Sequence, residues 1–525
     1  MQRTGFLTAA AAAAGVLTLA MGGPAALAGP DTNILNIGMA STDAGRLDPH
    51  LSATTVDKAV FGWMFNGLVR FAPGSASPET IEPDLAESWE SSDDGLEWTF
   101  HLRQGVQCHH DYGELTADDI VYSLNRAADP DRSSFSSDYE AFETVEAVDP
   151  YTVRIVLSHP VPSLLGLVTA YQGGNIVCKA AAEEMGEDFQ NRPIGTGPFM
   201  FDEYRPQQSL SLVANPNYFR GAPMLDGILY RYIPSDSARD LAFQSGEIDL
   251  IYGRQDQTWV ERIRELPDVT VMVMEPAEMS VMHLNTSAAP LDDIRVRQAM
   301  AYAVNREEFM DFKGRDVVRI ATSIVPQGYL GHADLSDLMP PFDLEQSAAL
   351  LAEAGHPDGV TLHVIHTALP GMLDTMEVFQ AQMARANITL DMEVVEHSTF
   401  HAQIREDLSQ VVHYSAARFP IADIYLTQFY HSRSIVGTPT AVTNFSHCGN
   451  ADAQIDAARV ETDPEAQKAL WEEAQRLLME NFCSIPIYEN LQIWARHDYL
   501  DLGYELTGSL SLGPPVTEST HFVSN

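Results

Sequence analysis

Metal-ligating residue types gather in one short stretch, CHHDYGE, at positions 108–114. Its candidate ligands are Cys108, His109, His110, Asp111 and Glu114. Cysteine, histidine and carboxylate are the ligands that zinc takes in proteins, so the stretch suggests a secreted metal-dependent hydrolase. Metal sites usually show a defined spacing and a distant second pair, and the chain offers only His447–Cys448 for that role. We favour a polar loop after a strand, and we predict neither a metal site nor a catalytic residue.

A second stretch, PIGTGPF at positions 193–199, has glycines that could cradle a phosphate. It lacks the lysine and the sequence of a P-loop, so we interpret it as a tight turn whose backbone lies close to a neighbour. The chain also has no Gly-x-Ser-x-Gly elbow and no His-Glu-x-x-His motif. These absences argue against hydrolase, nucleotide-binding and zincin chemistry, and we expect no cofactor.

The charge balance is strongly acidic, with 73 acidic against 31 basic side chains and a formal net charge of −42. Such a field repels nucleic acid and anionic lipid, so we expect neither as a partner. At 525 residues and 45% hydrophobic, the chain should form two or three compact units. Four cysteines allow three disulfide pairings, and the sequence leaves the choice open. They are Cys108, Cys178, Cys448 and Cys483.

The first 28 residues have the pattern of an export signal. Arg3 supplies the positive region, residues 6–21 the apolar region, and Ala26 to Ala28 the cleavage site. The apolar run is too short for a comfortable membrane span, and no cysteine follows the cleavage site to carry a lipid. We therefore expect a mature protein that is periplasmic, soluble and not lipid-anchored.

Strands are the first secondary-structure elements expected along the chain after the signal, and they would help to position any site. Asp94 and Gly95 form a strong turn signal, and the residues after them alternate between apolar and polar, which predicts a hairpin. Thr116 is expected to cap a helix, and Ser235 another that ends at Gly246. The inward face predicted for the second helix consists of Ala238, Leu241, Ala242 and Ser245.

Beyond Pro290, helices and strands alternate, which indicates a second α/β lobe. One amphipathic helix is predicted from the spacing of Val296, Ala299, Met300, Ala303 and Val304. Asn305 and Glu308 predict a capping box for the helix that follows. Asp463 and Pro464 should open a long helix to about Glu480. Its core face is predicted to be Ala466, Leu470, Ala474, Leu477 and Leu478.

Taken in order, these segments resemble the family 5 extracellular solute-binding proteins, which serve ABC importers of oligopeptides, dipeptides, nickel complexes and some sugars. The matching pieces span nearly the whole chain after the signal. They include LDPH (47–50), GLVRF (67–71), PIGTGPF, SGEIDL, DIRVRQAMAYAVNREEF and YLTQFYHS. The resemblance implies an α/β fold of the type II periplasmic-binding-protein kind, with two lobes joined by crossing strands and an extra subdomain in lobe I.

The resemblance also implies how the chain divides. The expected parts are a signal peptide (1–28), lobe I (29–63, 173–283 and 489–525), its extra subdomain (64–172) and lobe II (284–488). The ligand would lie in the cleft between the lobes and be enclosed when they close, because it contacts both lobes at once.

The implied function is that of a binding protein without catalysis. It would capture a small solute and deliver it to ABC permease subunits in the inner membrane, and we expect it to act as a monomer. The solute would be a peptide, a peptide-like compound or an anion. Metal-chelate or haem import stays open because His109, His110 and His447 are present. A secreted metal-dependent hydrolase and delivery of the ligand to a sensor also stay open as functions.

In peptide-binding relatives, the segment that corresponds to residues 415–432 carries a tryptophan and, three residues on, an aspartate that pairs with the peptide ammonium. Ser415 and Arg418 stand at these two positions, and Ala53 replaces an acid found in some relatives. A cation in that place repels an ammonium group. We therefore hypothesise that Arg418 grips a carboxylate, a phosphate or another acceptor on the ligand. The alternative is that Arg418 pairs with Asp423 or another of the many acids and only supports the cleft.

Six further residues are lesser candidates for ligand contact, each with a purely structural role as the alternative. They are Thr54, Thr55, Phe135, His366, Phe419 and Asp423.

Overall fold

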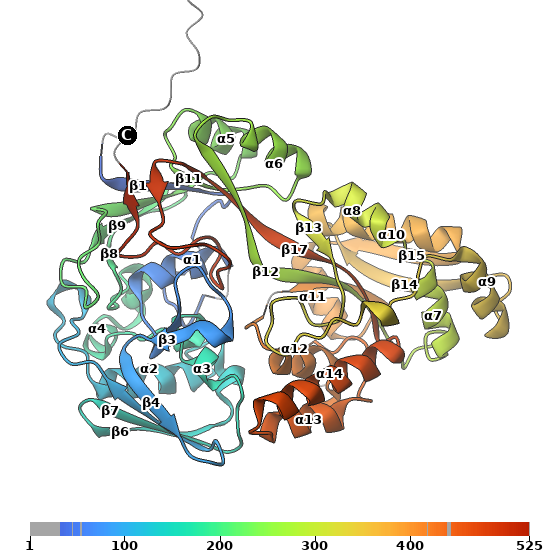
Figure 1. Ribbon diagram of the computed structural model, residues 1–525, viewed down its shortest axis with the longest axis horizontal. Helices are drawn as coiled ribbons and strands as arrows, with labels where there is room; N and C mark the ends of the chain where they lie inside the picture. Colours follow the sequence, from blue (N-terminus) through green and yellow to red (C-terminus); the bar gives the residue numbers. More distant parts are fainter. Residues whose placement is uncertain (1–31, 45, 53–54, 417, 438–442, 524–525) are drawn as a thin grey trace, which may run out of the picture.

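Two α/β bodies joined by two long strands make up the computed structural model (Figure 1). The structure describes residues 32–44, 46–52, 55–416, 418–437 and 443–523. The expected signal at 1–28, Ala53 and Thr54 lie outside these residues. The connecting strands are β12 (Val269–Leu284) and β17 (Ser484–His497). This is the two-lobe α/β fold expected from the sequence. Within the described ranges, no helix is long and apolar enough to cross a bilayer.

One sheet of nine strands runs through both lobes in the order β16-β12-β17-β11-β1-β10-β9-β8, with β13 paired to β17. Strand β1 is parallel to β10 and β11, and the other neighbours are antiparallel. The lobes are therefore joined by a shared hydrogen-bond ladder, with register shifts in β12 between Met274 and Glu278 and between Ser280 and Val281. The strand bounds are β1 Ile34–Met39, β8 Phe199–Arg205, β9 Ser209–Ala214, β10 Gly227–Tyr232, β11 Leu250–Tyr252, β13 Val318–Ile320 and β16 Val411–Ala416.

A four-stranded antiparallel sheet, in the order β4-β5-β7-β6, forms the lower part of the first lobe in Figure 1. The predicted hairpin is confirmed, since Gly95 takes a positive φ of 68° between β4 and β5. Thr116 caps α2 as predicted, and its backbone N–H donates to Asp119 at 2.8 Å. The bounds are β2 Val69–Phe71, β3 Ile81–Pro83, β4 Ala86–Ser91, β5 Glu97–Leu102, β6 Phe142–Asp149, β7 Thr152–Leu157, α2 Ala117–Ala128, α3 Leu164–Leu167 and α4 Lys179–Met185.

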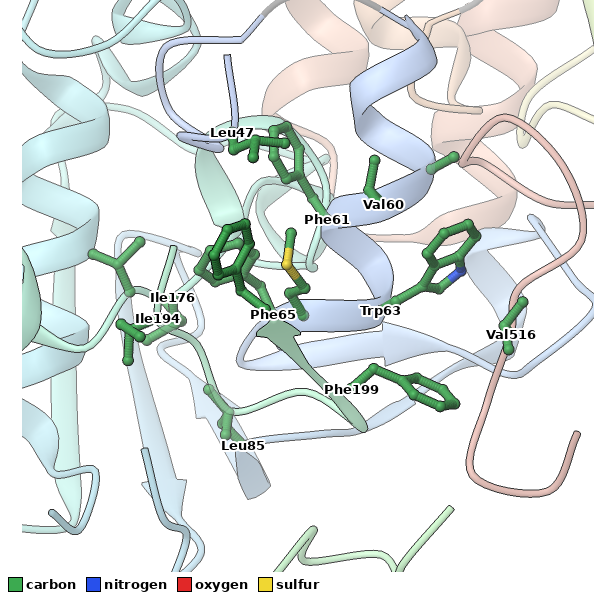
Figure 2. Packing of buried hydrophobic residues seen from close by; sticks show 14 of the residues in the cluster. Leu47, Val60, Phe61, Trp63, Phe65, Leu85, Ile176, Ile194, Phe199 and Val516 are labelled. Carbon is green, nitrogen blue, oxygen red and sulfur yellow. The ribbon is translucent and has the colours of Figure 1, made fainter. Parts of the chain in front are cut away.

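Helix α1 (Thr55–Met64) is anchored in the largest apolar cluster of the first lobe (Figure 2). Phe61 and Phe65 pack edge to face, with ring centroids 6.1 Å apart. Trp63 packs in the same way on Tyr230, at 5.6 Å. Burial of these rings fixes the helix in the lobe, so that its first turn, which carries Lys58, is held in place.

The second lobe surrounds a parallel pair of strands, β14 (Val360–Thr367) and β15 (Ile388–Val395). The five residues predicted as the inward face near residue 300 are all buried, as expected from their helical spacing. The helix bounds are α7 Ile294–Tyr302, α8 Arg306–Lys313, α9 Leu344–Glu353, α10 Pro370–Arg385, α11 His397–Arg405, α12 Ala422–Tyr430, α13 Asp452–Val460 and α14 Pro464–Glu480.

The remaining elements belong to the first lobe or are short turns. They are α5 Asp236–Gln244, α6 Gln257–Arg264, β18 Leu500–Asp501 and β19 His521–Phe522, with 3₁₀ turns η1 Pro78–Thr80, η2 His109–Asp111, η3 Ser136–Tyr139, η4 Gln172–Gly174, η5 Gly186–Asn191, η6 Ser336–Leu338 and η7 Ser432–Ser434.

Of the inward face predicted for α5, only Ala242 is buried, and the other three residues are exposed. Leu241 is 68% exposed, whereas Arg239 and Asp240 are buried. Arg239 donates to the carbonyl oxygen of Ile233 at 2.8 Å, and Asp240 accepts from the indole N–H of Trp259 at 2.8 Å. Because these polar groups find partners inside, the helix turns them inward and leaves the leucine in solvent.

Two further local predictions need correction. Asn305 caps α8, but Glu308 does not close a capping box, because the Asn305 backbone N–H donates to Gln382 at 3.0 Å instead. The core face of α14 is rotated toward Trp471 and Gln475, and only Ala474 and Leu478 of the predicted face are fully buried. In both cases, contacts with residues distant in the sequence decide which groups are bonded or buried. Helical spacing does not reveal such contacts.

Two disulfides use all four cysteines, Cys108 with Cys178 and Cys448 with Cys483. They close loops of 70 and 35 residues. By the loop-entropy model, each stabilises the folded state by about 4 kcal/mol. The first bridge lies within the first lobe, and the second ties the end of α14 to a preceding loop, so each acts inside one lobe.

Arg319 links the two connecting strands through one guanidinium group. It donates to Glu489 of β17 at 2.7 Å and pairs with Glu275 of β12. Glu489 is fully buried, and it also accepts from the backbone N–H of Gln327 at 3.0 Å. Burial raises the pKa of the Glu489 carboxyl, and the charge of Arg319 opposes that rise. The positive charge of Arg319 therefore stabilises the buried carboxylate of Glu489 between the two strands.

Replacement of Arg319 by methionine should lower the free energy of unfolding by about 3 kcal/mol, because Glu489 is left buried without its counter-ion. The matched control is Arg315→Met, whose partners Glu307 and Asp311 are exposed. That loss should stay below about 1 kcal/mol. Urea unfolding followed by circular dichroism measures both, and equal midpoints for the two variants would contradict this role of Arg319.

Candidate ligand-binding site

The loop before α1 is fixed by buried polar contacts. Asp48 receives two hydrogen bonds from the Arg126 guanidinium, one of them at 2.9 Å. The His50 ring lies 2.9 Å from the carbonyl oxygen of Asn175, and the backbone N–H of Ser134 donates to the backbone carbonyl oxygen of His50 at 2.9 Å. These contacts hold the LDPH segment, and with it the start of α1, against the rest of the first lobe.

Arg418 follows β16 in the second lobe and is held from three directions. Its backbone N–H donates to the Tyr329 hydroxyl at 2.9 Å, and that hydroxyl donates back to the Arg418 carbonyl at 2.9 Å. Its Nε donates to Gln428 at 2.6 Å, and its Cζ lies 5.0 Å from the centre of the Phe429 ring. This restraint pre-organises the guanidinium, which reduces the entropy lost when a ligand binds.

Cations from both lobes converge on two acids. Burial raises the pKa of the Glu278 carboxyl in β12, and the charges of Arg418 and Lys58 lower it in part. The same three causes act on Asp138 of η3, whose pKa is also raised. Lys58 belongs to the first lobe and Arg418 to the second, so charges from both lobes act on each acid.

Tyrosines line the same region. Lys58 donates to the Tyr171 hydroxyl at 3.3 Å and lies over that ring. Burial raises the pKa of Tyr329, with smaller contributions from Tyr171 and Glu278. Burial also raises the pKa of Tyr252 to about 12, with Glu278 as the next cause. We call this set the interlobe site. Its members are Lys58, Asp138, Tyr171, Tyr252, Glu278, Tyr329 and Arg418.

The lobes touch through Phe419, next to Arg418. Its ring lies 5.7 Å from that of Phe71 in β2 and packs directly over Gly166 in α3. A Cβ at Gly166 would lie 2.2 Å from Phe419 Cζ, so only glycine allows this approach. Lys468 of the second lobe also lies 3.9 Å from Glu79 of the first. The structure is therefore a closed form.

Two of the lesser candidates are buried in the lobe interiors. Phe135 packs in the first lobe, where its carbonyl oxygen accepts from the backbone N–H of Asp138 at 2.9 Å. His366 is fully buried in the second lobe, with its ring 3.1 Å from His413. His413 in turn lies 2.9 Å from the hydroxyl of Ser280 in β12. Phe135 thus holds Asp138 through a backbone hydrogen bond, whereas His366 lies in the interior of the second lobe.

The pairing of Arg418 with Asp423, one form of the structural alternative, is not formed among the described residues. Asp423 is buried and lies 3.5 Å from Arg459, while Arg418 binds Gln428. Burial raises the pKa of Asp423, and Arg459 opposes that rise. Thr55 is the first residue of α1, and Thr54 lies outside the described residues. Of the predicted candidates, only Arg418 and Phe419 are therefore placed together between the lobes.

The metal-type stretch is a polar loop, as favoured from the sequence. Cys108 forms a disulfide, and the rings of His109 and His110 lie 2.9 Å from the carbonyl oxygens of Gly197 and Phe201. Across the described part of the chain, no group of three or more histidine, cysteine or acidic side chains is arranged to hold a metal ion. The backbone of the PIGTGPF segment lies close to the end of α1, since a Cβ at Gly195 would lie 2.2 Å from the Met64 carbonyl oxygen.

Sequence reasoning missed Lys58, Asp138 and Glu278. Lys58 offered one signal, because it is one of only four lysines in the chain and closely follows the LDPH loop. The two acids offered none, since 73 acidic residues are present.

The family model for bacterial extracellular solute-binding proteins, family 5, matches residues 80–437. The chain belongs to this family, so it is a solute-binding protein and not an enzyme.

Among solved structures, the chain is similar to MoaA from A. tumefaciens R10 in complex with mannopinic acid, at 50% identity and a TM-score of 0.82. That match covers 94% of this chain and 99% of MoaA. The chain is also 30% identical to di/tripeptide-binding protein 2 of Pseudomonas aeruginosa, over 85% of this chain and 87% of that protein. Heme-binding protein A of Haemophilus influenzae is 29% identical, over 81% of each chain.

A Gly166→Ala substitution should hold the lobes apart, because the added methyl group takes the place of the Phe419 ring. We expect a larger radius of gyration by X-ray scattering and weaker ligand binding, with the fold of each lobe intact by circular dichroism. The control is the double variant Gly166→Ala/Phe419→Ala, in which the clash is removed. A single variant as compact as the wild type would contradict this contact.

Proposed function

We propose that this protein is exported to the periplasm, captures a carboxylate-bearing opine of the mannopinic acid type as a monomer, and presents it to an ABC permease. Export rests on the signal expected over residues 1–28. The division of the chain into lobes at about residues 283 and 488 is part of the same proposal. It is supported by the position of β12 and β17, which connect the two bodies.

The observation that carries the choice of ligand is the pair of cations, Lys58 and Arg418, one from each lobe. A carboxylate between them would be bound by both lobes at once and would favour the closed form. Mannopinic acid, a conjugate of a sugar alcohol with glutamate through a secondary amine, offers such carboxylates. The 50% identity to a protein solved with that compound supports the same choice.

Di- and tripeptides are the second candidate class. The 30% identity to a di/tripeptide-binding protein favours them, and the acids of the interlobe site could receive a peptide ammonium. Arg418 argues against them, because it stands where peptide-binding relatives have an aspartate. Competition between a dipeptide and mannopinic acid separates the two classes.

Isothermal titration of the purified protein with mannopinic acid should give a dissociation constant in the micromolar range or below. Arg418→Met should weaken binding by about 2 kcal/mol, roughly 30-fold, through loss of charge-assisted hydrogen bonds.

The matched control is Arg476→Met, on an exposed face of α14 and paired only with Glu472 among the described residues, which should bind as the wild type does. Wild-type affinity in the Arg418 variant would overturn the assigned grip. Displacement of mannopinic acid by micromolar dipeptide would indicate that the protein binds peptides.

A further inference from the structure

A pair of histidines lies one helical turn apart at the start of α11. The sequence HSTFH at positions 397–401 gives His397 and His401 the spacing i, i+4, which brings both rings to one flank of the helix. Their Nε2 atoms lie 3.2 Å apart, and the rings are inclined at 75° with their centroids 4.5 Å apart. Because the nitrogens lie closer together than the ring centres, the two rings converge with their Nε2 edges.

The separation of the two nitrogens suits one shared metal ion. Imidazole nitrogens bind Zn²⁺ at about 2.0–2.1 Å, so two of them at a tetrahedral angle lie roughly 3.4 Å apart. At the right angle typical of Cu²⁺, the separation is roughly 2.9 Å. The 3.2 Å between His397 and His401 falls between these two values. The alternative is a hydrogen bond between two neutral rings, which has a similar length.

The other ring nitrogen of His397 is oriented by a partner. Its Nδ1 lies 3.0 Å from the hydroxyl oxygen of Thr367, which also accepts from the backbone N–H of Leu369 at 3.1 Å. Metal-ligating histidines are commonly held in this way through the nitrogen that does not bind the metal. Thr367 ends β14 opposite Val395 of β15, so the pair lies at the carboxyl edge of two parallel strands, where α/β folds bind ligands.

Aromatic packing restricts both rings. Phe400, which is fully buried, stacks on His397 with the centroids 6.3 Å apart and inclines against His401 at 5.4 Å. Tyr414 of β16 meets the His401 ring edge to face at 6.0 Å. The Nδ1 of His401 is buried, so its Nε2 is the nitrogen that an ion can reach. Both histidines stay partly exposed, and because their rings are already restricted, little further freedom is lost when an ion binds.

Nearby charges act in both directions. Glu396, just before the helix, accepts from the backbone N–H of Thr399 at 3.3 Å, which holds its negative charge at the first turn. Arg405, one turn beyond His401, donates to the His401 carbonyl oxygen at 3.4 Å. These two local charges oppose each other. The net charge of −42 attracts cations to the molecule as a whole, so the long-range field favours a divalent ion.

We propose that His397 and His401 form a binding site for one divalent transition-metal ion, Zn²⁺ or Cu²⁺. Each histidine supplies its Nε2, and water completes the coordination. Two protein ligands are fewer than the three or four of resident zinc sites, so the ion exchanges with solution. The pair shares no residue with the interlobe site, and the inference therefore goes beyond the proposed function and does not depend on it.

The test uses the metal ions alone. Protein treated with a chelator, dialysed and titrated with Zn²⁺ by calorimetry should bind one ion with a dissociation constant of roughly 10 µM, because the site supplies two ligands where structural zinc sites supply four. Cu²⁺ should bind more tightly than Zn²⁺. The electron paramagnetic resonance spectrum of the Cu²⁺ form should show two imidazole nitrogens, and a spectrum with oxygen ligands only would overturn the assignment.

Matched variants separate the pair from the other histidines. His397→Gln and His401→Gln should each weaken Zn²⁺ binding at least about tenfold, with the fold unchanged by circular dichroism. Thr367→Val keeps the shape of the side chain and removes the orienting hydroxyl, so it should weaken binding by roughly tenfold. The control, His363→Gln, removes an exposed histidine of β14 in the same lobe and should bind as the wild type does.

Two results would contradict the inference. Wild-type Zn²⁺ affinity in both His397→Gln and His401→Gln would place the ion elsewhere on the acidic surface. Failure of the wild-type protein to bind either Zn²⁺ or Cu²⁺ would leave the pair as a hydrogen bond between neutral rings.

Discussion

The antiparallel pairing of β12 with β17 is the constraint on which the rest of the structure depends. These strands belong to the sheet of the first lobe and continue into the second, so a hydrogen-bonded ladder joins the lobes. Arg319 ties the ladder from the side through Glu275 and Glu489. The ladder breaks its register between Met274 and Glu278.

The interlobe site works against the field of the whole molecule. With a net charge of −42, the surface repels anions over distances of about one Debye length, roughly 8 Å at physiological salt. Lys58 and Arg418 oppose this field locally, where the surrounding protein strengthens their attraction for carboxylates.

Features of the fold that depend on neighbouring residues could be predicted from the sequence. The turn at Asp94–Gly95, the cap at Thr116 and the buried face around Met300 all follow from local chemistry and periodicity. The inward face of α5 could not be predicted, because its polar residues are satisfied by Ile233 and Trp259. The disulfide pairing also depended on contacts between distant segments.

The site shows the same division. Arg418 was identified because it departs from a family pattern, and Phe419 because it is adjacent. Glu278 and Asp138 are two acids among 73, and only the closed fold brings them to the same two cations. His366 has a chemically suggestive side chain, but burial directs it to His413 and the interior.

A crystal structure of the purified protein with mannopinic acid tests the central claim most directly. The account predicts closed lobes, with a ligand carboxylate about 3 Å from the Arg418 guanidinium. A ligand bound between the lobes with its sugar-alcohol end at Arg418, or one bound elsewhere, would contradict it.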